Sequence, residues 1–147
     1  MDRRKNGTKH HLLTDANGTP LAASVTAANR NDITQLLPLV DGVPPVGGKP
    51  GRPRRRPDRL QGDRGYDSDR HRGELDARGI EPVLARRYRP HGSGLGVYRW
   101  VVERSHSWLH QQRRLRNRYE RRGDIHEALV LLACIRICMN VLKGKWL

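Results

Sequence analysis

The stretch LQGDRGYDSDRHRGEL, residues 60–75, decides the fold class of this chain. Its short apolar lead ends at Asp63 beside a glycine-containing turn, so it predicts a strand that stops near Asp63. Ser68 or Asp67 is then placed to cap a helix over DRHRGELDAR. A strand followed at once by a turn and a helix is typical of α/β proteins.

Three roles are open for Asp63: turn former, helix cap or metal ligand. The two acids that follow it have local explanations, because Asp67 suits a cap and Asp69 lies in the first helical turn, where negative charge meets the helix dipole. Asp63 has no such local role in the sequence pattern. It lies where a strand ends, which is the usual position of active-site groups in α/β folds.

The sequence before this stretch predicts a hairpin and a short helix. Two strand-forming runs, at about 9–14 and 20–27, flank DANG, whose Asn-Gly pair favours a tight turn. Asn31 or Asp32 would cap a helix over DITQLLPLV, and Pro38 is placed to end that helix early.

The sequence after it predicts one strand and two long helices. The helix behind Asp63 closes at Gly79, and IEPVLARR is a second strand candidate. Residues 97–121 predict one long helix, and the final helix begins at the cap Asp124 and closes at Gly144. The order strand–strand–helix–strand–helix–strand–helix–helix is an α/β plan within a single domain.

The charge of the chain points to a polyanionic partner. It has 29 Lys and Arg against 15 Asp and Glu in 147 residues, a net charge of +14, and nucleic acid is the commonest polyanion in a cell. The alternative is a GC-rich coding sequence, which also inflates arginine. Residues 43–58 (VPPVGGKPGRPRRRPD) cannot pack a core and predict a disordered basic loop, either a solvated linker or an arm that contacts phosphate. The arginines that would bind DNA there are Arg52, Arg54, Arg55 and Arg56.

Neither a membrane nor a disulfide is indicated. The longest apolar run, 128–135, is too short to span a bilayer and ends at Arg136. Cys134 and Cys138 lie on one face of a predicted helix, where they cannot easily pair, so free thiols and a reducing cytoplasm are expected.

A second unusual acid lies in YRWVVERSHSWLHQQRRLRNRYER, residues 98–121. Glu103 shares a helical face with Arg99, one turn earlier, and an ordinary surface ion pair would explain both residues. The alternative is a metal ligand.

Together, DRGYDSDRHRGEL and GLGVYRWVVERSHSWLHQQRRLRNRYER resemble the C-terminal part of bacterial insertion-sequence transposases of the DDE type. The resemblance implies a ribonuclease H-like mixed sheet flanked by helices, in which Asp, Asp and Glu hold two Mg²⁺ ions. By this resemblance Asp63 matches the second acid and Glu103 the third, and we expect Glu103 to be buried or half-buried on a helix that faces Asp63. Arg99 matches a basic residue near the third acid, and Arg113 or Arg114 would serve as the basic residue that follows it.

The resemblance also implies a first acid on a central strand upstream of the hairpin. The chain reaches KHHLL by residue 9, with no room for that strand. The expectation is therefore a fragment, incomplete at its N-terminus and inactive alone, that belongs to an enzyme for DNA cleavage and strand transfer. DNA would be its partner, together with a second copy or an upstream-encoded transposase segment, in the cytoplasm at the nucleoid.

Two other hypotheses compete with this one. The chain could be a non-catalytic basic fragment that binds DNA and modulates a full-length transposase. It could also be an unrelated RNA-binding protein, but no Phe, four Tyr and three Trp offer few surfaces on which bases could stack.

Overall fold

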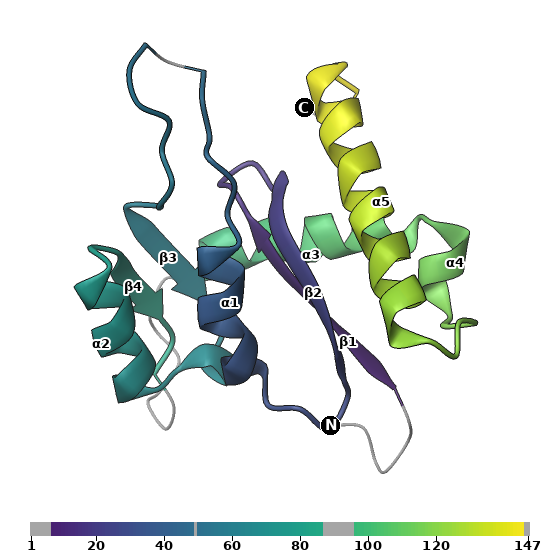
Figure 1. Ribbon diagram of the computed structural model, residues 1–147, viewed down its shortest axis with the longest axis horizontal. Helices are drawn as coiled ribbons and strands as arrows, with labels where there is room; N and C mark the ends of the chain where they lie inside the picture. The colour runs from purple at the N-terminus through teal and green to yellow at the C-terminus, as the bar shows by residue number, and fades with distance from the viewer. Residues whose placement is uncertain (1–6, 49, 87–95, 146–147) are drawn as a thin grey trace. The chain divides into compact units, whose positions relative to one another are not determined.

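The computed structural model describes residues 7–48, 50–86 and 96–145, and the side chains of 96–99 lie outside that description. The chain divides into two compact units, and Figure 1 labels the helices and strands that belong to them. Residues 1–30 and 97–147 form the first unit, and residues 31–96 form the second. Strands and helices occur in both, which confirms the α/β class.

The first unit begins with the predicted hairpin. Strands β1 (Thr8–Thr14) and β2 (Pro20–Ala27) pair antiparallel. In the turn, one carboxylate oxygen of Asp15 accepts hydrogen bonds from the backbone N–H groups of Asn17 and Thr19, at 2.9 and 2.8 Å. Gly18 has φ +83°, a conformation that glycine adopts at no steric cost.

The prediction of one helix over 97–121 is wrong for nearly half of that range. Helix α3 (Gly96–His110) ends, and a short helix α4 (Arg113–Arg116) follows after a turn. Continuing α3 would stack several arginines on one face three and four residues apart, where like charges repel. The turn instead brings Leu115 into the apolar core.

Helix α5 (Gly123–Leu142) packs against β2 and completes this core. Asp124 was predicted to be its cap, but the cap position is Arg122, and Asp124 lies in the first turn, where the two side chains form an ion pair. Gly144 closes the helix as predicted. The core of the first unit consists of Trp108, Leu109, Leu115, Val130, Ala133, Cys134 and Ile137.

By length and composition, α5 could cross a membrane, although a core helix of a water-exposed protein passes the same test. Its buried side chains include Val130 and Ile137, neither of which is exposed at all. Cys134 and Cys138 are free thiols on this helix, as predicted. Burial raises the pKa of the Cys134 thiol to about 11, so this thiol is protonated at neutral pH.

The second unit begins with a 3₁₀ turn, η1 (Asp32–Gln35), and helix α1 (Leu36–Asp41). Asn31 is the cap, one of the two predicted, and its side chain accepts from the N–H of Ile33. The prediction that Pro38 ends the helix early was wrong. Pro38 lies in the first turn of α1, where a missing N–H costs nothing.

Strands β3 (Arg59–Gly62) and β4 (Glu81–Leu84) pair in parallel. Between them run the 3₁₀ turn η2 (Arg64–Tyr66) and helix α2 (Asp69–Ala77), which packs against β4. Ser68 takes the predicted cap position without a side-chain capping bond. In the described part of the chain, the strands therefore form two separate two-stranded sheets.

Candidate functional site

Asp63 follows the last residue of β3 and precedes η2. Its backbone is extended, with φ −72° and ψ 166°, and its side chain caps the turn by accepting from the N–H of Arg64 at 2.6 Å. The prediction that this residue has no local role was wrong, because Asp63 is a cap. The carboxylate is nevertheless exposed. A cap and a metal ligand are compatible roles, since a carboxylate has about four lone-pair directions.

A second carboxylate, Asp32, lies at the same turn. Asp32 Oδ2 would be 3.2 Å from a Cβ atom added to Gly65, so a larger residue at position 65 would crowd it. Burial raises the pKa of Tyr66 to about 12, and the negative charges of Asp32 and Asp63 contribute. Sequence reasoning treated Asp32 only as a possible cap. No local signal could have linked it to Asp63, because the packing of η1 on η2 brings Asp32 to the turn where both acids act on Tyr66.

Asp67 fixes the far end of this turn. Its Oδ1 atom lies 2.7 Å from Nη2 of Arg72 and 2.8 Å from Nε of the same residue. The same Nη2 atom donates to the carbonyl oxygen of Leu84 at 2.7 Å. Because the pair joins the turn to the end of β4, Asp67 does more than the capping role predicted for it.

Glu103 lies on α3, as predicted, but its side chain is exposed rather than buried or half-buried. Arg99 belongs to the same helix, and its side chain lies outside the described part of the chain. The residues next to Glu103 are firmly held. The guanidinium carbon of Arg104 lies 4.4 and 4.9 Å from the ring centroids of Trp100 and Trp108, an arrangement that favours a cation–π interaction.

Ser105 attaches α3 to the hairpin turn. It is fully buried, and its hydroxyl oxygen lies 2.8 Å from the carbonyl oxygen of Gly18 and 2.9 Å from that of Val101. A Cβ atom on Gly18 would lie 2.8 Å from Ser105 Oγ, so the turn and the helix touch closely. The segment that carries Glu103 is thereby fixed within the first unit.

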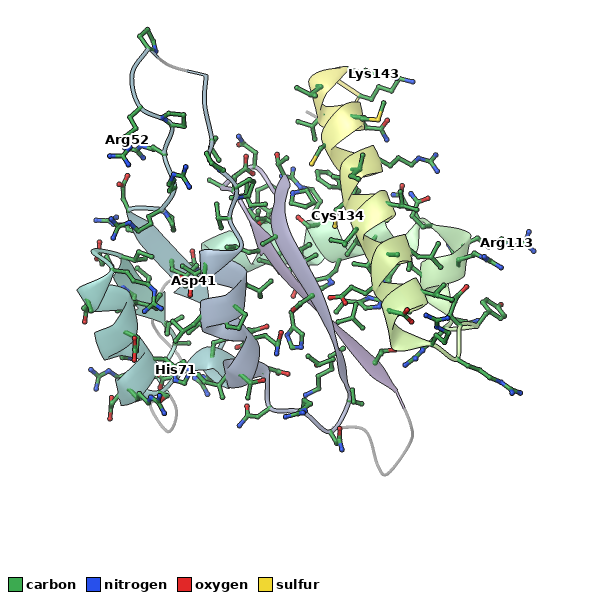
Figure 2. All side chains as sticks on the ribbon, viewed as in Figure 1. Asp41, Arg52, His71, Arg113, Cys134 and Lys143 are labelled. Carbon is green, nitrogen blue, oxygen red and sulfur yellow. The ribbon has the colours of Figure 1, made fainter. Side chains whose placement is uncertain are left out.

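The predicted DNA-binding arginines are all exposed in the structure, apart from Arg99, whose side chain is not described. Arg113 and Arg114 belong to α4. Figure 2 shows Arg113 extending from this helix and Arg52 from the loop that precedes β3. Within that loop, a backbone bridge joins Val46 to Arg54. The disorder expected for 43–58 stays a prediction.

The comparisons with known proteins identify the family. A family model described as a transposase DDE domain matches residues 2–138. The chain belongs to the DDE transposases. It is 62% identical over 142 residues to a putative transposase for insertion sequence element IS402 of Burkholderia cepacia, covering 97% of this chain and 67% of that protein. It is 30% identical over 118 residues to the transposase for insertion sequence element IS1106 of Neisseria meningitidis serogroup B, covering 74% of this chain and 37% of that protein. No solved structure matches the chain significantly.

The family match covers both predicted acids, but they belong to different units. Asp63 is in the second unit and Glu103 in the first, and the structure does not fix the units relative to each other. A shared metal pair between these carboxylates of the transposase therefore stays a prediction. Within the described ranges, no group of three or more His, Cys, Asp or Glu side chains is arranged to hold a metal ion.

Proposed function

We propose that this chain carries part of the active site of an insertion-sequence transposase that cleaves DNA at transposon ends and transfers strands to a target in a Mg²⁺-dependent reaction. The observation that carries the proposal is the position of Asp63. It is an exposed carboxylate directly after a strand of a parallel pair, within the region that the family model matches. Active-site groups of α/β folds gather at such strand ends.

Asp63 and Glu103 would hold Mg²⁺ in the complete enzyme. Their carboxylate oxygens are the hard ligands that this ion prefers. A bound Mg²⁺ pair polarises phosphoryl oxygens and stabilises the charge that develops in an in-line displacement. The chain itself orients Asp63 through the Arg64 N–H bond and holds the Glu103 segment through Ser105. Exposed arginines such as Arg113 would bind the phosphates of the substrate.

We further propose a ribonuclease H-like sheet for the assembled enzyme. In that fold a central strand, bearing the first acid, would pair with both β1 and β3. The two separate two-stranded sheets of the described chain support this proposal, because each would have an edge available to such a strand. Two acids alone are too few to hold a metal pair in good geometry, so we expect a third acid to complete the metal site in the assembled enzyme.

A chimera tests the proposal. The segment of the Burkholderia cepacia relative that lies outside the matched region would be fused in frame to this chain, and nicking of a plasmid carrying the DNA that flanks the gene would be measured with Mg²⁺. We expect the chimera to nick the plasmid, and Asp63→Asn or Glu103→Gln to abolish nicking while retaining DNA binding. Asp69→Asn is the matched control, because Asp69 is an exposed acid of the same region in the first turn of α2.

Cleavage that survives Asp63→Asn in the chimera would refute the assignment of this acid. The second candidate function is a DNA-binding fragment that modulates a full-length transposase. It is favoured by the net charge of +14, which attracts DNA whether or not a metal is held. It predicts a chain that binds DNA and lowers the nicking rate of an added full-length relative, even when Asp63 and Glu103 are both replaced.

A further inference from the structure

A wide groove lies wholly within the first unit. Its walls are formed by both strands of the hairpin, the last turn of α3 and the segment that leads from α4 to α5. Its volume is about 1300 Å³, whereas sites for small molecules are usually about 300–1,000 Å³. The groove is therefore large enough for a polymer segment.

The groove carries positive charge that no carboxylate in the described ranges neutralises. Arg116, Arg118 and Arg121 line it. Arg116 donates to the carbonyl oxygen of His110, and Arg118 donates to those of Glu120 and Arg121. In the part of the chain that the structure describes, none of the three guanidinium groups pairs with a carboxylate. Charged guanidinium groups that lack a carboxylate are suited to phosphate.

The one acid that lines the groove within the described ranges already has cationic and polar neighbours. The Glu120 side chain is only 9% exposed, with Oε1 3.6 Å from Arg114 Nη1 and Oε2 3.7 Å from His126 Nδ1. Its carboxylate is therefore largely buried, beside Arg114 and His126. A phosphate in the groove would meet little opposing negative charge.

Aromatic rings lie among these charges. Tyr119 is 67% exposed and lines the groove between Arg118 and Glu120. His106 and His110 line it too, with ring centroids 6.4 Å apart. Burial lowers the pKa of His106, and the neighbouring His110 adds to this effect, so at neutral pH the His106 ring can meet a base without carrying charge.

We propose that this groove binds a single strand of DNA, with the three arginines on its phosphates and Tyr119 stacked on a base. An exposed ring distinguishes a single strand from a duplex, because the faces of bases are covered by their neighbours in a duplex and open in a single strand. The inference rests on the proposed function to the extent that DNA is the substrate. It adds a separate site for a strand unpaired from its complement.

Fluorescence anisotropy with the whole chain tests the proposal. The probes are a labelled oligothymidylate of about 12 nucleotides, within the usual length for such sites, and a duplex of the same length. Stacking on one base contributes about 1–3 kcal/mol, so Tyr119→Leu should weaken binding of the oligothymidylate about 5- to 150-fold. Binding of the duplex should not change. Tyr119→Phe keeps the ring and should bind both probes like the native chain.

Arg121→Gln tests the interaction with phosphate, because among the described residues the Arg121 side chain makes no bond that the substitution would break. For the oligothymidylate, the substitution should make the plot of log binding constant against log salt concentration less steep by about 0.7. Arg70→Gln, an exposed arginine of α2 in the other unit, is the control and should leave that slope unchanged. Circular dichroism establishes that each variant is folded.

An unchanged affinity of Tyr119→Leu for the oligothymidylate would overturn the proposal, as would an equal loss on both probes. The result is independent of the proposed metal site, because Asp63→Asn and Glu103→Gln should bind the oligothymidylate normally. If those two variants retained cleavage in the chimera while Tyr119→Leu lost single-strand binding, the catalytic assignment would fail and the groove would stand.

Discussion

The ion pair between Asp67 and Arg72 should hold the turn that presents Asp63. Arg72→Met removes the charge and keeps most of the length of the side chain. It leaves the Asp67 carboxylate without its guanidinium and the Leu84 carbonyl without that donor. We expect the second unit to lose stability, and the turn next to Asp63 to loosen with it.

The magnitude follows from burial. The two side chains are 16% and 13% exposed. Removing one partner of a fully buried pair costs about 3–5 kcal/mol, and the residual access of water to Asp67 reduces this to about 2–4 kcal/mol. Asp67→Asn combined with Arg72→Met removes both charges. It should therefore cost less than the sum of the two single substitutions.

Hydrogen exchange is the suitable assay because it reports on each unit separately. The N–H of Ile80 donates to the carbonyl oxygen of Leu75 between two buried side chains, so its exchange requires the second unit to open. Arg72→Met should speed this exchange by about 30-fold or more. Arg70→Met, an exposed arginine on the same helix, is the control. Equal effects of the two substitutions, or no effect of Arg72→Met, would refute the reasoning.

Three other predictions concern pH, backbone conformation and DNA binding. Burial and the neighbouring histidines, His126 first, lower the pKa of His10 from 6.5 to about 4. As the pH falls, His10 is therefore protonated in the unfolded chain before it is protonated in the folded one. The contribution of neutral His10 to the free energy of unfolding should be fully present above about pH 6.5 and be lost as the pH falls towards 4. Because His10 is half-exposed, we expect this loss of unfolding free energy to be only about 1 kcal/mol. The melting temperature of His10→Gln should vary less with pH than that of the native chain. Gly18→Ala should cost about 1–3 kcal/mol in urea unfolding, because φ is +83° and Ser105 lies in contact. Gly73→Ala, in open space within α2, should instead stabilise by about 0.5–1 kcal/mol, and destabilisation there would contradict this account. Alanine at the loop arginines should make the plot of log binding constant against log salt concentration for duplex DNA less steep, by about 0.9 for each phosphate that is no longer neutralised. An unchanged slope would show that these side chains do not touch the DNA backbone. Those arginines are Arg52, Arg54, Arg55 and Arg56.

Local signals predicted the elements better than they predicted the packing between them. The Asn17-Gly18 pair predicted the hairpin, and Gly79 predicted the end of α2, because both glycines need a positive φ that few residues adopt. Helical periodicity failed at α3, since it cannot register that a turn at Gln112 brings Leu115 into the core.

The candidate site was predicted only in part for the same reason. Asp63 was proposed from its predicted place at a strand end, and the structure confirms that place but not its role. Its bond to the Arg64 N–H depends on a 3₁₀ turn that the sequence did not reveal. Its neighbour Asp32 comes from a distant element. The exposure of Glu103 depends on which face of α3 packs against the hairpin, and Ser105 determines that face through a long-range bond.

The interrupted first unit has a consequence for the order of folding during synthesis. Its hairpin is made first, but the helices that cover it come only after residue 96. The second unit is continuous in sequence, so it can fold while the hairpin still waits for its partners. To complete the first unit, the hairpin must then meet helices that lie beyond the whole second unit in the sequence. Because the second unit is already folded, the flexible loop between these segments is shorter, and the entropic cost of closing it is lower. The nascent chain should therefore complete its second unit first and leave the apolar face of the hairpin open until α5 has left the ribosome.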